Sequence, residues 1–128
     1  MAENVYTAVD VTATGDDFYD AIVVLNANWA ILDALQSAIA TLDNDATPSV
    51  EGGRSFITGG TTTITDFDDG ITGQIIHVIA EHSLTITDGT NIFLNGSANW
   101  AMTATDTLTL ICKADGKWYE LSRGDNGA

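Results

Sequence analysis

The stretch TTTITDFDDGITGQIIHVIA, residues 61–80, holds the pattern that decides the fold class of this chain. β-branched residues dominate both of its ends, and the turn-forming run Asp-Asp-Gly separates them. Short runs of β-branched residues bounded by turn residues are typical of β-strands. This stretch therefore predicts two strands, TTTITDF (61–67) and QIIHVIA (74–80), joined by a turn.

The same pattern continues from this stretch toward residue 123. A strand-like run and a turn alternate about every 8–12 residues, which is typical of a small sandwich, barrel or prism. The further expected strands are SLTIT (83–87), NIFLNG (91–96), TLTLICKA (107–114) and KWYEL (117–121). The turn signals at 87–91 and 114–116 are those of hairpins. We therefore predict a small all-β head over residues 48–128.

The residues before Pro48 follow a different pattern. Residues 1–15 are predicted to form an extended arm, with apolar side chains at Val5, Tyr6, Val9 and Val11. Asp16 then offers an N-cap, and neither Gly nor Pro occurs from there to Leu42. We expect one long helix of about 40 Å, at 1.5 Å per residue, within a stem formed by residues 16–47. The fold class predicted for the whole chain is α+β.

The apolar residues of the expected helix form two adjacent seams with alternating spacings of four and three residues. Such spacing is that of a coiled coil, and two seams make a face too wide for a solitary surface helix. We therefore expect self-association of the chain through this face. The alternative is a helix that folds onto the β part of its own monomer. The expected interface residues are Phe18, Ile22, Leu25, Asn28, Trp29, Leu32, Leu35, Gln36, Ile39 and Leu42.

The charge of the chain excludes several classes of partner. The net charge is −14, from 18 acidic and 4 basic residues, and all the basic residues follow position 53. Binding to nucleic acid or to an anionic membrane needs a basic surface, so we expect neither partner. Such a charge favours docking onto a basic surface, although it also suits a merely well-solvated one. Residues near Met1 show no signal-peptide pattern, and a single cysteine, Cys112, suits a reducing cytoplasm as a buried structural thiol.

Few residues of the chain suggest chemistry. Asp66, Asp68 and Asp69 form a carboxylate cluster of the kind that holds Ca²⁺, with a tight turn as the alternative. In a symmetric assembly, three copies of this cluster can meet near an axis and form a shared site. His77 and His82 are the two histidines, and no nucleophile elbow or paired-carboxylate motif accompanies them. We therefore expect no enzymatic activity and no cofactor.

Two parts of the chain resemble proteins of tailed-phage virions. FYDAIVVLNANWAILDALQSAI (18–39) resembles helical segments near the N-termini of phage fibre and capsid-decoration proteins. Residues 53–123, with TTTITDFDDGITGQIIHVIA, LTITDGTNIFLNG and DTLTLICKADGKWYELSR, are similar to small β modules of phage virion proteins. The resemblance implies a homotrimer with a helical stem, a β head and a structural role.

These observations give a leading functional prediction and two alternatives. The leading one is a trimeric capsid decoration (cement) protein, assembled in the host cytoplasm, whose arm binds the major capsid protein or another virion protein. The first alternative is a short head or tail fibre, or an adaptor, that contacts host surface glycans or a larger fibre. In that case Trp100, Trp118 and Tyr119 would form a sugar platform, whereas the alternative for these three residues is a place in the core or in the trimer interface. The second alternative is a hydrolase acting on surface polysaccharide.

Overall fold

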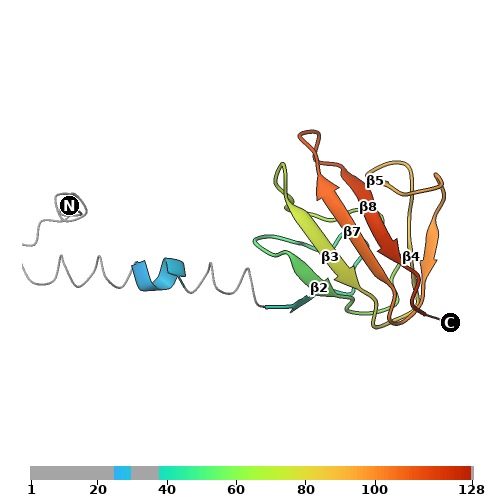
Figure 1. Ribbon diagram of the computed structural model, residues 1–128, viewed down its shortest axis with the longest axis horizontal. Coiled ribbons are helices and arrows are strands. Elements are labelled where there is room, and N and C mark those ends of the chain that lie inside the picture. The colour runs from blue at the N-terminus through green and yellow to red at the C-terminus, as the bar shows by residue number, and fades with distance from the viewer. Residues whose placement is uncertain (1–24, 30–37, 128) are drawn as a thin grey trace, which may run out of the picture. The chain divides into compact units, whose positions relative to one another are not determined.

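The computed structural model describes residues 25–29 and 38–127, and it divides the chain into two units between Ser37 and Ala38 (Figure 1). In the described part, residues 25–29 are helical and the second unit is a β domain of eight strands. Several expected arm and seam residues lie outside the described part: Val5, Tyr6, Val9, Val11, Phe18, Ile22, Leu32, Leu35 and Gln36.

The β domain contains a mixed sheet of six strands in the order β1-β2-β3-β7-β8-β5. The strand bounds are Ala40–Thr41 (β1), Ser55–Ile57 (β2), Ile75–Ile79 (β3), Ile92–Phe93 (β5), Thr107–Cys112 (β7) and Trp118–Gly124 (β8). The central pairs β3–β7 and β7–β8 are antiparallel, whereas β1–β2, β2–β3 and β5–β8 are parallel. Figure 1 shows β3, β7 and β8 side by side in the middle of this sheet.

A second, smaller sheet pairs β4 (Leu84–Ile86) with β6 (Trp100–Met102) in antiparallel fashion. Ile64 adds a parallel bridge to Ile86. It is the single residue of the expected strand 61–67 that pairs with β4, so the prediction of a full strand there was wrong. Thr61, Thr62 and Thr63 are exposed instead.

The core of the β domain follows from alternation along the strands. In β7, Leu108, Leu110 and Cys112 are buried, and the residues between them are half-buried. Side chains from the two sheets belong to one hydrophobic cluster, with Val78 of β3 and Ile86 of β4 among them. Successive side chains of a strand point to opposite faces, so one face of each strand supplies this core. The mostly β architecture of this part was therefore predicted correctly from the sequence pattern.

The two expected hairpin turns have different outcomes. At 114–116 the hairpin between β7 and β8 is confirmed, because the Lys113 N–H donates to the Lys117 carbonyl at 3.0 Å and Gly116 has a φ of 78°. Residues 87–91 connect β4 to β5, and these strands lie in different sheets. The hairpin prediction there was wrong, because the same local turn chemistry also serves a crossover between sheets.

The predicted end of the long helix at Leu42 was also wrong. Ala40 and Thr41 form β1, and the Leu42 N–H donates to the Ile57 carbonyl at 2.9 Å. Leu42 is 2% exposed and belongs to the core of the β domain. A 3-4 apolar spacing indicates that one side of a segment is buried. At residues 40–42, pairing with β2 and burial in the β domain override the helical preference of the alanine-rich sequence.

Candidate functional site

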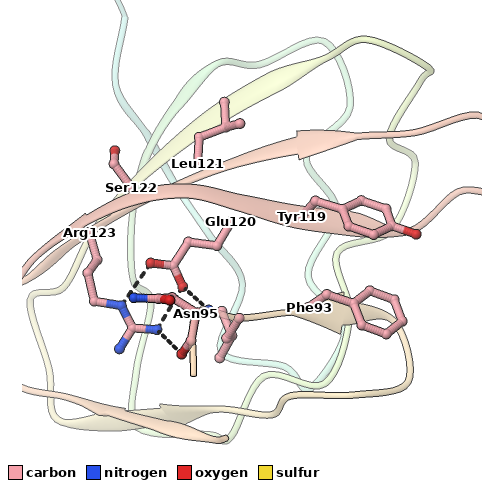
Figure 2. Close-up of a pocket in the computed structure, with 8 residues that line it drawn as sticks. Phe93, Asn95, Tyr119, Glu120, Leu121, Ser122 and Arg123 are labelled. Atoms are coloured by element: carbon pink, nitrogen blue, oxygen red, sulfur yellow. Dashed lines mark hydrogen bonds and ion pairs between the residues drawn. The ribbon is translucent and has the colours of Figure 1, made fainter. Parts of the chain in front are cut away.

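A surface depression in the β domain lies where β5 leaves β8. β5 pairs with β8 only at Ile92–Trp118 and Phe93–Tyr119, whereas β8 continues to Gly124. The chain after Phe93 diverges, and an open groove of about 560 Å³ remains beside the free edge of β8 (Figure 2). Its lining consists of Phe93, Leu94, Asn95, Tyr119, Glu120, Leu121, Ser122 and Arg123.

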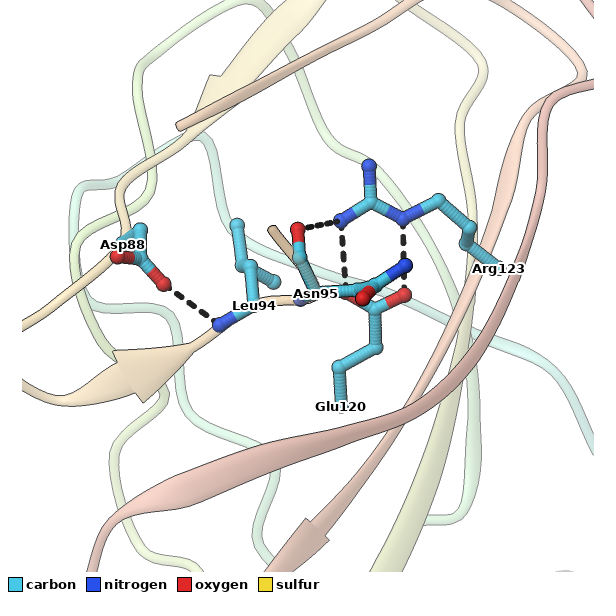
Figure 3. Close-up of polar contacts among 5 residues, drawn as sticks. All are labelled: Asp88, Leu94, Asn95, Glu120 and Arg123. Carbon is cyan, nitrogen blue, oxygen red and sulfur yellow. Dashed lines mark hydrogen bonds and ion pairs between the residues drawn. The ribbon is translucent and has the colours of Figure 1, made fainter. Parts of the chain in front are cut away.

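Side chains of β8 connect the two walls of this groove. The Arg123 Nε and Nη2 atoms donate to the Glu120 carboxylate at 2.8 and 2.7 Å, and Nη2 also donates to the Asn95 carbonyl at 3.4 Å. The Asn95 N–H in turn donates to Glu120 at 2.8 Å (Figure 3). An unpaired strand edge invites pairing with another chain, and charged side chains placed along it oppose such pairing. The contacts among Glu120, Arg123 and Asn95 therefore close part of the free edge of β8.

The environment of Glu120 keeps its carboxylate ionised. Its side chain is 5% exposed, and the hydrogen bonds from Arg123 are the largest cause that holds the pKa of Glu120 below its ordinary value. Desolvation acts in the opposite direction, and the bond from the Asn95 N–H adds to the lowering. A general acid needs a raised pKa, so Glu120 is unsuited to that role. It is the one carboxylate among the eight lining residues, and paired carboxylates for glycoside hydrolysis are not assembled in the groove.

A second contact fixes the position of Arg123. Its guanidinium lies 4.2 Å from the centroid of the Trp100 ring, which is half-buried and packs against the core. Cation–π contacts of this kind stabilise by about 0.5–1 kcal/mol at exposed sites and more when desolvated. On the other wall of the groove, the Asp88 carboxylate accepts the Leu94 N–H at 2.6 Å (Figure 3). The groove is therefore held by polar contacts on both walls.

The three aromatic residues expected to form a sugar platform do not share a surface. Trp118 is fully buried and its Nε1–H donates to the Phe67 carbonyl at 3.0 Å, so it is a core residue, as the alternative to the sugar platform predicts. Trp100 is covered on one face by Arg123. Tyr119 lies in the groove, stacked on Phe93 with 5.1 Å between ring centroids, and its hydroxyl donates to Asp115 at 3.0 Å.

The expected carboxylate cluster does not converge within one chain. In the described residues, no group of three or more His, Cys, Asp or Glu side chains is arranged to hold a metal ion. The Asp66 carboxylate accepts the Phe67 N–H at 2.8 Å, and Asp69 accepts the Ser49 hydroxyl. The backbone of Asp68 forms an isolated parallel β-bridge with the backbone of Ser49. A site shared by three copies at a symmetry axis stays a prediction.

The two histidines and the cysteine occupy structural positions. His77 lies on the outer side of β3 and shares a hydrogen bond with Thr109 at 3.0 Å, and His82 shares one with the buried Thr58 hydroxyl at 2.9 Å. Cys112 is buried, as expected, and desolvation raises the pKa of its thiol. A reactive cysteine has a lowered pKa and an accessible sulfur, so Cys112 is a structural thiol.

The described seam residues are exposed, apart from the buried Leu42. Leu25 and Trp29 lie four residues apart in the helical segment 25–29, and Trp29 is 67% exposed. Residues at this spacing share one face of a helix. Asn28 is exposed as well, and Ile39 is exposed just before β1. The role of these residues in an oligomer interface stays a prediction.

Comparison with known proteins gives no relative from which to assign a role. No protein-family model matches the chain, and neither a curated protein nor a solved structure was found to match it. The described residues contain no helix long and apolar enough to cross a membrane.

Proposed function

We propose that this chain is a non-enzymatic structural protein of a tailed-phage virion, a trimeric capsid decoration (cement) protein that binds and stabilises the shell. The observation that carries the proposal is the exposure of Leu25 and Trp29 on one face of a helical segment. Burial of a large apolar side chain stabilises by about 1.5–3 kcal/mol, so association that covers these two side chains is favoured.

The β domain supports the proposal because the buried residues of its core all belong to the second unit. Its buried apolar residues run from Leu42 to Trp118, all within the second unit. A small domain with its own core can serve as a head while other residues hold copies together. The net charge of −14 suits docking onto a basic patch of a shell protein.

The first experiment measures the oligomeric state of the full chain by sedimentation equilibrium. We expect a trimer for the wild type, and dissociation for the double variant Leu25→Asp/Trp29→Asp, because carboxylates would replace both apolar side chains. The matched control is Asn26→Asp/Ala27→Asp, which adds two carboxylates to the same segment at positions outside both seams. A wild-type protein that stays monomeric at all concentrations contradicts the proposal.

The second experiment tests the role on the particle. Thermal disruption of purified capsids is followed with and without the added protein, and the expected result is a higher disruption temperature that the Leu25→Asp/Trp29→Asp variant does not produce. Electron microscopy of the same particles locates the protein. Binding confined to the tail, with no effect on the shell, contradicts a cement role.

A short head or tail fibre that binds a glycan is the second candidate, and the open groove with Phe93 and Tyr119 favours it. Aromatic rings beside exposed polar groups suit sugar rings, and Asn95 and Ser122 are exposed polar residues in the lining. A glycan array separates the two candidates. Binding that is lost in Tyr119→Ala supports a fibre, and an array without binding supports the cement role.

A further inference from the structure

The outer face of the six-stranded sheet differs from an ordinary solvated sheet face. Its residues are the positions on β2, β3, β7 and β8 that alternate with the buried ones, and none of them is Asp, Glu, Lys or Arg. They are Ser55, Ile57, Ile75, His77, Ile79, Thr107, Thr109, Ile111, Tyr119, Leu121 and Ser122. We call this set the outer face.

The strand register arranges the outer face in rows. Ile75 pairs with Ile111, and Ile111 with Tyr119, which pairs with Phe93, so one row across four strands is apolar. The next row is polar and consists of Ser55, His77, Thr109 and Ser122. Leu121 adds an apolar side chain that is 54% exposed.

The charged residues of β8 do not interrupt this face. The register shift opposite Thr109 and Leu110 leaves Leu121 as an extra residue, so Leu121 and Ser122 are both exposed while Glu120 is covered. In Figure 2, Leu121 and Ser122 point away from the side of the strand occupied by Glu120 and Arg123. The bulge thus removes both charges from the outer face.

The absence of charge on the outer face contrasts with the rest of the domain. Residues 38–127 contain twelve acidic and four basic side chains, and the outer face contains none of them. The core of a protein interface is depleted of charged residues and enriched in aromatic ones. The pattern of the outer face therefore matches an interface more closely than a surface that faces water.

We propose that the outer face packs against the β domain of a second copy of this chain. Two copies of so acidic a domain repel each other wherever carboxylates meet, and none of the strand positions of the outer face carries a carboxylate. Charge reaches this face only at its hairpin end, where the Asp115 carboxylate accepts the Tyr119 hydroxyl at 3.0 Å and the Lys113 ammonium lies 5.3 Å from the centroid of the Tyr119 ring. This inference rests on the proposed function, because it takes the copies to be already held together by the helical segment with Leu25 and Trp29.

The size of the outer face explains why such a tether is needed. Four strands about 4.8 Å apart and about five residues long at 3.3 Å each cover roughly 19 by 17 Å. That footprint is smaller than the roughly 800 Å² that each partner buries in a standard stable interface. Tethering raises the effective concentration of neighbouring heads to about millimolar, at which a small apolar contact forms.

The experiment compares double variants of the full chain by sedimentation. Ile75→Lys/Ile111→Lys places two ammonium groups in the apolar row, at positions that are not fully buried, so the domain is expected to fold with an unchanged circular dichroism spectrum. The matched control is Thr61→Lys/Thr62→Lys, at exposed positions that belong to none of the strands of the outer face. We expect the face variant to raise the dissociation constant of the oligomer at least about tenfold relative to the control, since about 1.4 kcal/mol corresponds to that factor.

Cross-linking provides the second measurement. A short bismaleimide is expected to join copies through Ser122→Cys and not through Thr62→Cys, while the buried Cys112 stays unreacted. An assembled trimer that Ile75→Lys/Ile111→Lys leaves intact, with no cross-link at position 122, overturns this inference and leaves the proposed function standing. The inference is also overturned if Ile75→Lys/Ile111→Lys loses binding to the particle but remains a trimer, because the outer face then contacts the shell. A monomeric wild type overturns both.

Discussion

The two faces of the six-stranded sheet come from the same strands and have opposite properties. In β3, Ile76 and Val78 are fully buried, whereas the intervening His77 is exposed and Ile75 is 37% exposed. Neither face of β3 carries a charge, although the chain is strongly acidic. The inner face supplies the core of the domain, and among the described residues the outer face is exposed or half-buried. Substitutions on the two faces should therefore separate folding from association.

The largest expected effect tests the inner face at Trp118. Trp118→Ala removes a fully buried ring, its edge-to-face contact with Phe67 and the bond to the Phe67 carbonyl. We expect a loss of about 3–5 kcal/mol in the free energy of unfolding, measured by urea titration with circular dichroism as the signal. Leu121→Ala on the outer face is the control, with an expected change within about 0.5 kcal/mol. Similar losses for both variants would show that the outer face contributes as much to the free energy of unfolding as the inner face.

The second prediction concerns the segment that leads into the β domain. Leu42→Ala should lower the free energy of unfolding by about 3 kcal/mol, because Leu42 lies in the core of the domain. Ile39→Ala, three residues earlier and exposed, should change it by less than about 0.5 kcal/mol. If both residues belonged to the predicted helical interface, the two variants would instead affect association to a similar extent. Urea titration and sedimentation of both proteins distinguish these outcomes.

The sequence pattern predicted the strands whose burial is set by local alternation. The expected strands 74–80, 107–114 and 117–121 contain or overlap β3, β7 and β8. The sheet order and the parallel pairs of β1, β2 and β5 depend on contacts between distant residues, and alternation gives no information about them. β6 was missed because Asn-Gly-Ser-Ala-Asn reads as a turn, although Trp100 pairs with Ile86 directly after it.

The groove was not predictable for a specific geometric reason. Glu120 and Arg123 are three residues apart, and in a regular strand such residues point to opposite faces. The bulge at Leu121 shifts the alternation by one residue, so the two side chains meet at 2.7 Å. A bulge depends on the pairing with β7, which the sequence near Glu120 does not specify. The Glu-x-x-Arg spacing is thus visible in the sequence, but whether the two side chains meet depends on the fold.

The smallest expected effect on stability concerns Asp106, a charged residue in the interior of the domain. Asp106 is the one charged residue in the described part of the chain that is buried as a whole residue, at 1% exposure. Its carboxylate accepts the N–H groups of Thr103 and Gly127, each at 2.7 Å, and the Thr103 hydroxyl at 3.2 Å. The bond from the Thr103 N–H is the largest cause that lowers the pKa of Asp106, against desolvation. Asp106→Asn turns one acceptor into a donor that faces an N–H, and we expect a loss of about 1–3 kcal/mol at pH 7.

The pH dependence of that loss identifies its cause. The pKa of Asp106 is lower in the folded than in the unfolded state, so the folded state binds fewer protons. The stabilisation is therefore complete above the unfolded-state pKa of about 3.9 and disappears as the pH falls through the lower folded-state value. Urea titrations at pH 7 and pH 3 should show the difference between wild type and Asp106→Asn shrinking at the acidic pH. A difference that stays constant would mean that Asp106 stabilises the domain by packing, as the apolar residues of the inner face do, and not by its charge.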